Sequence, residues 1–157
     1  MEDTADRTPS ASKYPTRRIS VLIADDHTAV RDGLRALLEA ESDIEVVGEA
    51  ENGRRVVELV KQVAPAVVIM DIAMPLLNGL EATRQIRRSV PETRVLIFSM
   101  HRDDEYVQEV LQAGASGYVV KQTVAHELLA GIRAVSRGQP YLSALLAQSP
   151  PQRKKGD

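Results

Sequence analysis

The stretch AVVIMDIAMP, residues 66–75, decides how the rest of the sequence is interpreted. Five apolar residues end in a single aspartate, Asp71, and Pro75 follows four residues later. A short apolar run bounded by a turn signal is typical of a strand that is buried on both faces. A carboxylate directly after such a strand needs a reason, because a buried charge is costly unless it is paired or binds a metal.

Short apolar runs of the same kind recur along the chain and alternate with stretches of helical periodicity. The predicted strands cover residues 19–24, 44–50, 66–70, 94–100 and 117–120. The predicted helices start near Thr28, at 53, at 80 and at Asp103, and a last one carries Leu128, Leu129, Ile132 and Val135 on one face. We expect Gly114 to cap the fourth helix and Gly138 and Pro140 to end the last one.

This alternation predicts an α/β domain. Strands that are apolar throughout, joined by helical crossovers, form a five-stranded parallel sheet that is doubly wound, with helices on both faces. Periodicity alone leaves the strand order open between a flavodoxin-like and a Rossmann arrangement.

Composition excludes several classes of function. The 157 residues include no Cys and no Trp, and aromatic residues make up 3%. Disulfides, thiolate metal sites and aromatic stacking platforms for single-stranded nucleic acid are therefore excluded. A net charge of −2 gives no reason to expect the whole chain to bind DNA or an anionic membrane. No run is long enough to span a bilayer and the N-terminus lacks a secretory signal, so we expect a cytoplasmic protein.

Composition also divides the chain into three parts. Residues 1–16 are rich in Thr, Ser, Pro and charge, and predict a disordered leader. The folded domain is expected over 17–138. Residues 139–157 contain prolines and a basic cluster and are interpreted as a linker or tail.

Polar side chains that could bind a ligand or take part in a reaction stand at the ends of four of the five predicted strands. Asp25 and Asp26 follow the first strand, Asp71 the third and Lys121 the fifth, and Ser99 lies at the end of the fourth. Taken singly, each has an ordinary explanation as a helix cap, a turn residue or a surface charge. Ligands of doubly wound sheets bind at the carboxyl ends of the strands. In the order 2-1-3-4-5 all five side chains would meet there, and this coincidence favours a functional site.

The chemistry of such a site follows from its charges. Three converging carboxylates repel one another unless a cation neutralises them, and a hard divalent ion such as Mg²⁺, or Mn²⁺, suits oxygen ligands. An ionised Asp71 beside that ion can attack phosphorus and form an aspartyl phosphate. Lys121 and the Ser99 hydroxyl would then bind phosphoryl oxygens. We also expect Lys121 to keep Asp71 ionised when the metal is absent.

Four motifs at these positions resemble the receiver domain of two-component response regulators. They are VLIADDH (21–27), VVIMDIAMPLLNGLEATRQIR (67–87), VLIFSMH (95–101) and AGASGYVVK (113–121). The resemblance covers about residues 18–138 and implies a flavodoxin/CheY-like fold with strand order 2-1-3-4-5. The resemblance makes Asp71 the phosphoacceptor and Lys121 the phosphoryl-binding lysine. It makes Asp26 a direct metal ligand, Asp25 a ligand through water and the main-chain carbonyl of Ala73 a further ligand. It also makes Ser99 the switch hydroxyl, Tyr118 the aromatic that changes rotamer, and Ala73 and His101 the residues that tune hydrolysis.

The resemblance also implies partners. A sensor histidine kinase would donate the phosphoryl group, and the response would reach the surface made by the fourth helix, fifth strand and fifth helix, where phosphorylation promotes a homodimer. The expected chemistry is limited to self-phosphorylation and self-dephosphorylation, so the protein is not an enzyme in the usual sense. No membrane partner is expected.

A narrower resemblance is to receivers of the NarL/FixJ (LuxR-type) subfamily, carried especially by RGQPYLSALLA (137–147). Those proteins continue into a helix-turn-helix domain that binds DNA, and this chain has no such segment after Leu146. We favour a receiver fragment of a longer transcription regulator, with a stand-alone receiver as the alternative. Gln122 replaces the proline that many receivers carry after the lysine, so we expect a trans peptide bond there.

Two other classes of function fit less well. A phosphatase of the haloacid-dehalogenase type also uses an Asp nucleophile with Mg²⁺, but its DxD motif follows the first strand, where this chain has Asp25-Asp26-His27. A nucleotide-binding module would need a glycine-rich phosphate loop, and the sequence has none. The histidines at 27, 101 and 126 are far apart in sequence and make a poor case for a metal site.

Overall fold

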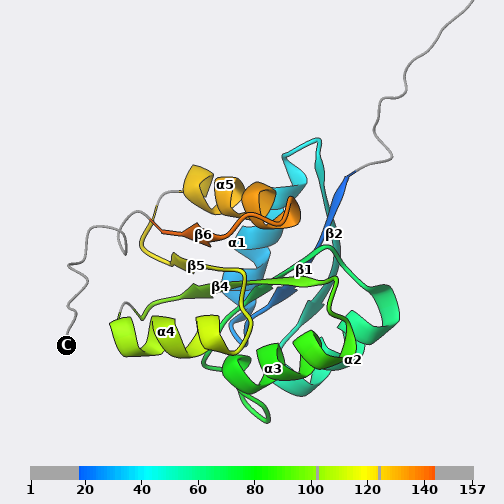
Figure 1. Ribbon diagram of the computed structural model, residues 1–157. Helices are drawn as coiled ribbons and strands as arrows, with labels where there is room; N and C mark the ends of the chain where they lie inside the picture. Colours follow the sequence, from blue (N-terminus) through cyan, green and yellow to red (C-terminus); the bar gives the residue numbers. More distant parts are fainter. Residues whose placement is uncertain (1–17, 102, 124, 144–157) are drawn as a thin grey trace, which may run out of the picture.

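The computed structural model describes residues 18–101, 103–123 and 125–143 (Figure 1). The predicted leader and most of the predicted tail lie outside these residues. The elements, in chain order, are β1 (Ile19–Ala24), α1 (Thr28–Glu39), β2 (Ile44–Ala50), α2 (Gly53–Val63), β3 (Val67–Met70), α3 (Gly79–Ser89), β4 (Arg94–Ser99), α4 (Asp104–Gln112), β5 (Gly117–Val120), α5 (Ala125–Ser136) and β6 (Tyr141–Leu142).

The strands form one parallel sheet in the order β2-β1-β3-β4-β5-β6. The predicted order 2-1-3-4-5 is therefore confirmed for the five longer strands. The sheet also has a sixth strand, β6, in the stretch that the sequence suggested was a tail. Tyr141 and Leu142 pair with Gly117 and Tyr118 of β5, and the backbone N–H of Ser143 donates to the Tyr118 carbonyl at 2.8 Å.

Alternate residues of the central strands serve two separate cores. Leu22 and Val68 point into a core covered by α2, α3 and α4, whereas Val21 and Val67 point into a core covered by α1 and α5. Figure 1 shows the two groups of helices on opposite faces of the sheet. Because both faces are covered, every side chain of β3 is buried, which explains why the stretch before Asp71 is apolar without interruption.

Local signals place the helix ends close to the predicted positions. The side chains of Asn52 and Asn78 accept hydrogen bonds from the N–H groups of Arg55 and Glu81, which caps α2 and α3. Gly114 and Gly138, just after α4 and α5, adopt φ angles of 112° and 83°, a region that favours glycine. The predicted roles of these two glycines are thus confirmed.

Two glycines allow the loop after β3 to pack closely. A Cβ atom added to Gly53, at the start of α2, would lie 1.8 Å from the carbonyl oxygen of Leu77. A Cβ atom added to Gly79, at the start of α3, would lie 2.2 Å from the carbonyl oxygen of Asp71. Both contacts are with backbone, so the loop that follows Asp71 packs closely against the starts of α2 and α3.

Two further expectations concern the backbone and the membrane. Within the described residues all peptide bonds are trans, and this includes the bond after Lys121, as expected. None of the helices in the described part of the chain is long and apolar enough to cross a membrane.

Candidate functional site

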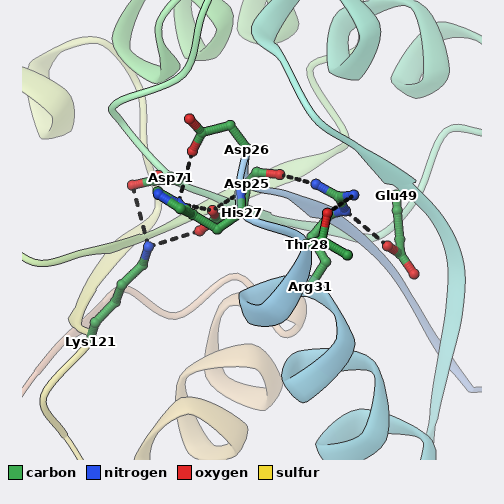
Figure 2. Close-up of polar contacts among 8 residues, drawn as sticks. All are labelled: Asp25, Asp26, His27, Thr28, Arg31, Glu49, Asp71 and Lys121. Carbon is green, nitrogen blue, oxygen red and sulfur yellow. Dashed lines mark hydrogen bonds and ion pairs between the residues drawn. The ribbon is translucent and has the colours of Figure 1, made fainter.

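The carboxyl ends of β1, β3 and β5 bring an acidic cluster and a lysine together (Figure 2). Asp25 and Asp26 follow β1, Asp71 follows β3, and Lys121 follows β5. The loops after β1 and β3 start side by side, because the Asp71 N–H donates to the Ala24 carbonyl at 2.9 Å. Parallel strands end at the same edge of the sheet, so neighbours far apart in sequence meet here.

Lys121 contacts two of the three carboxylates, and it lies closer to Asp25. Its Nζ atom is 2.8 Å from Oδ2 of Asp25 and 3.7 Å from Oδ1 of Asp71. The ammonium also lies 5.7 Å from the centre of the Phe98 ring, within the range of a cation–π contact. Its backbone N–H donates to the Ser99 carbonyl at 2.8 Å, which fixes the lysine beside the end of β4.

Asp71 is buried, and its environment does not favour the charge as strongly as the sequence suggested. Burial raises the pKa of the Asp71 carboxyl above its ordinary value, while the charge of Lys121 lowers it and the charge of Asp25 raises it again. The net direction is upward. Lys121 therefore acts in the expected sense, but desolvation outweighs it, because the residue is only 6% exposed.

The donor atoms of the cluster fit a divalent cation. Asp25, Asp26, His27 and Asp71 each offer one ligand atom, and these atoms all lie within 4.8 Å of one another. Three carboxylate oxygens are the ligands that Mg²⁺ and Mn²⁺ prefer. Asp26 remains partly open to solvent, with a side chain 33% exposed, which leaves an approach for water or a phosphate group.

His27 joins the cluster, although the sequence pattern gave the histidines no part in a metal site. Its Nδ1 atom lies 3.1 Å from Oδ1 of Asp25 and 3.0 Å from Oδ1 of Asp26. The expectation rested on whether the three histidines could meet one another. That expectation overlooked that His27 directly follows two candidate ligands, so it can join their site without the other two histidines.

Ser99 and Tyr118 lie next to each other at the end of β4 and in β5. Ser99 is buried, and its Oγ atom accepts a hydrogen bond from the His101 N–H at 3.1 Å. The buried Tyr118 hydroxyl donates to the His101 carbonyl at 2.9 Å. Burial raises the pKa of Tyr118, and hydrogen bonding with Ser99 opposes this. The start of the α4 region is thus tied to both predicted switch residues through His101.

The two residues predicted to tune hydrolysis occupy different surroundings. Ala73 is exposed in the loop after β3, and a hydrogen bond from its backbone lowers the pKa of Asp71 against the effect of burial. The exposed His101 ring packs edge-on against Tyr106, with centroids 4.6 Å apart.

Two functional candidates were missing from the sequence prediction. Arg31, on α1, donates from Nη1 to the backbone carbonyl of Asp25 at 2.7 Å and from Nε to Glu49 at 3.0 Å. Glu49 lies in β2, the strand for which the sequence gave no candidate site residue. A charged residue on a helix is ordinarily a solvated surface residue, so nothing in a single sequence distinguishes Arg31.

Comparisons with known proteins agree with this geometry. Residues 21–133 match the response regulator receiver domain family. The transcriptional regulatory protein DegU of Brevibacillus brevis is 42% identical over 125 residues, which cover 80% of this chain and 53% of DegU. The chain therefore spans little more than half the length of that relative.

Two solved structures resemble the chain over most of its length. A two-component response regulator of the LuxR family from Aurantimonas sp. SI85-9A1 has a TM-score of 0.80 and 37% identity, with 83% of this chain and 94% of that one covered. The isolated receiver domain of RcsB from Salmonella enterica serovar Typhimurium, in the presence of the phosphomimetic BeF₃⁻, has a TM-score of 0.77 and 26% identity, with 83% and 97% covered.

Proposed function

The chain belongs to the family of response regulator receiver domains, and from this premise we propose that it is a phosphoaccepting switch with Asp71 as the acceptor. The observation that carries the proposal is the position of the Lys121 ammonium, between Asp25 and Asp71 at 2.8 Å and 3.7 Å. One cation that contacts both the metal-binding and the nucleophilic carboxylate can bind a phosphoryl oxygen as the group arrives.

Asp25, Asp26 and Asp71 would hold the divalent ion, with the Ala73 carbonyl as a further ligand. When bound, Mg²⁺ or Mn²⁺ would neutralise the carboxylates and the charge of the incoming phosphoryl oxygens. His27 adds a nitrogen donor within reach of two of the aspartates.

Asp71 is the nucleophile in this proposal. One of its carboxylate oxygens forms a bond to phosphorus, and the bond from phosphorus to the imidazole nitrogen of a phosphorylated histidine kinase breaks. The imidazole leaves and takes a proton from solvent. Lys121 then moves its contact from the carboxylates toward a phosphoryl oxygen, and the Ser99 hydroxyl donates to another.

The switch would act through His101. Its N–H donates to the Ser99 Oγ atom and its carbonyl accepts from the Tyr118 hydroxyl. When Ser99 turns toward a phosphoryl group, that N–H loses its acceptor and the start of α4 shifts with the tyrosine. We propose that the face of α4, β5 and α5 then favours a homodimer.

The response regulators of the LuxR family among the relatives, and the transcriptional regulator DegU, support a transcriptional output. We propose that the complete protein works in the cytoplasm, receives phosphate from a sensor histidine kinase and contacts DNA through a C-terminal domain, with no membrane partner. The receiver itself would extend through β6, so that the linker begins after Ser143 rather than at 139. A stand-alone receiver is the alternative.

Phosphoryl uptake from labelled acetyl phosphate tests the proposal. With Mg²⁺ the chain should take up about one phosphoryl group, which hydroxylamine releases because an acyl phosphate is labile. Chelation of the metal or the substitution Asp71→Asn should abolish the label.

Asp104→Asn is the matched control, since Asp104 is an exposed acidic residue in the first turn of α4. It should leave labelling unchanged. Label that persists in the Asp71→Asn variant would overturn the proposal. Hydrolysis of a phosphomonoester over many turnovers would instead favour a phosphatase.

A further inference from the structure

Arg31 connects three structural elements beside the acidic cluster (Figure 2). Its Nη1 atom donates to the Asp25 carbonyl at 2.7 Å, its Nε atom to Oε1 of Glu49 at 3.0 Å, and its Nη2 atom to the Thr28 hydroxyl at 3.4 Å. These partners lie at the end of β1, in β2 and in the first turn of α1. The guanidinium therefore spans the base of the loop that carries Asp25 and Asp26.

Arg31 and Lys121 bind different groups of Asp25, and this difference affects how a metal ion could bind there. Lys121 binds the Asp25 carboxylate, whereas Arg31 binds the backbone carbonyl of the same residue. An arginine on the carboxylate would compete with a metal ion for the same oxygens. Bound to the carbonyl, Arg31 fixes the position of the residue without adding a further donor to the carboxylate, which Lys121 and the His27 N–H already contact.

Glu49 holds Arg31 in place. It accepts hydrogen bonds from the Nε atoms of both Arg31 and Arg35, and the side chains of Arg31 and Glu49 are only 16% and 24% exposed. Burial raises the pKa of Glu49, but the two arginines together outweigh it and the net shift is downward. Glu49 is therefore an anion near neutral pH, and it balances the charge of Arg31.

We propose that Arg31, anchored by Glu49, is a positioning residue that sets the β1–α1 loop in the geometry required for metal binding. The proposal rests on the proposed function, because it assumes that Asp25, Asp26 and Asp71 hold a divalent ion. It uses the planar fork of an arginine, which presents Nε to Glu49 and Nη1 to the Asp25 carbonyl in one fixed geometry, whereas a lysine ammonium lacks that fixed geometry.

Binding of Mn²⁺ tests this inference directly. The chain has no Trp, so loss of the free Mn²⁺ signal in electron paramagnetic resonance replaces fluorescence as the readout. Arg31→Gln and Arg31→Lys should each weaken Mn²⁺ affinity at least about tenfold, the usual effect of removing a group that orients a ligand. Labelling from acetyl phosphate should recover toward the native rate as Mn²⁺ is raised to saturation.

Arg35→Gln is the matched control. Arg35 contacts Glu49 and Glu39 but makes no hydrogen bond to Asp25 within the described part of the chain. This variant should retain native Mn²⁺ affinity, and thermal unfolding measured on all variants separates affinity from stability. Native affinity in both Arg31 variants would overturn the inference, and so would an equal loss of affinity in Arg35→Gln, because the effect would then not pass through the Asp25 carbonyl.

Failure of the inference differs from failure of the proposed function. If the unsubstituted chain binds no Mn²⁺, or if Asp26→Asn binds it equally well, the acidic cluster is not the metal site and both proposals fail. If the unsubstituted chain binds Mn²⁺ and takes up label while the Arg31 variants behave identically, only the role of Arg31 is wrong. Should Arg31→Gln not fold, Glu49→Gln is the second variant, with a smaller loss of affinity expected.

Discussion

The ammonium of Lys121 is about an ångström closer to Asp25 than to Asp71, at 2.8 Å against 3.7 Å. The lysine thus pairs mainly with a carboxylate that we propose binds the metal, and the proposed nucleophile keeps a weaker contact. This arrangement leaves Asp71 partly uncompensated in a buried position, which would favour the proposed reaction with an electrophilic phosphorus.

Removal of Lys121 should lower both the stability of the metal-free protein and the rate of phosphorylation. In Lys121→Met the carboxylates lose their internal cation, so the metal-free protein should unfold at a lower temperature and gain more stability from Mg²⁺ than the native chain does. Phosphoryl uptake should fall by about 10²-fold, the usual loss for one oxyanion-binding donor. Thermal unfolding with and without Mg²⁺ and the labelling rate check this, and an undiminished rate would contradict it.

Asp71→Asn should stabilise the metal-free fold near neutral pH. Burial raises the folded-state pKa above the ordinary 3.8, so the folded state holds a proton that the unfolded state releases, and stability decreases as pH rises through this window. The variant lacks this cost and should melt about 2–4 °C higher if the cost is about 1 kcal/mol. The difference should vanish well below the unfolded-state pKa, where both forms are neutral. A lower melting temperature near neutral pH would contradict this sign.

Gly53→Ala should destabilise the fold and disturb the site. The new methyl group would lie 1.8 Å from the Leu77 carbonyl oxygen, so the loop after Asp71 must move, at a cost of about 1–3 kcal/mol. Gly33→Ala is the control, because Gly33 lies inside α1 and a Cβ atom added there meets nothing within 4 Å. It should stabilise by up to about 1 kcal/mol. Denaturant unfolding measures both, and equal signs would refute the packing argument.

The ion pairs of Arg133 should add a small stability that depends on pH. Arg133 bonds Asp43 through Nε and Nη2 and Glu41 through Nη2, and its hydrogen bonds lower the pKa of Asp43. This stability is present above the unfolded-state pKa of about 3.8 and is lost as pH falls through the lower folded-state value. Arg133→Gln should cost less than about 1 kcal/mol near neutral pH, because the partners are partly exposed. The cost should shrink in acid, and a cost that grows there would contradict the assignment.

The sequence predicted the strands well because each is buried on both faces. An apolar run such as 67–70 has few alternatives in a doubly wound sheet, and the residues after it must then lie at the carboxyl edge. The pattern of residues therefore placed Asp25, Asp71 and Lys121 at the same edge, and the strand order 2-1-3-4-5, which the resemblance implied, brought them together there.

The remaining features depend on contacts that carry no local pattern. β6 is only two residues long and follows Gly138 and Pro140, so its pairing with β5 rests on backbone hydrogen bonds rather than on apolar periodicity. The pair of Arg31 and Glu49 is separated by 18 residues, and each residue by itself is an ordinary surface charge. The upward pKa shift of Asp71 depends on burial, which competes with the charges that a sequence displays.

The strand order has a consequence for how the chain acquires its structure during synthesis. β2 pairs with one edge of β1 and β3 with the other, and β4, β5 and β6 each pair with the strand that precedes them. No strand has to enter between two strands that are already paired. Each βα unit can therefore add to an open edge of the sheet in the order of synthesis, without displacing a strand that is already paired.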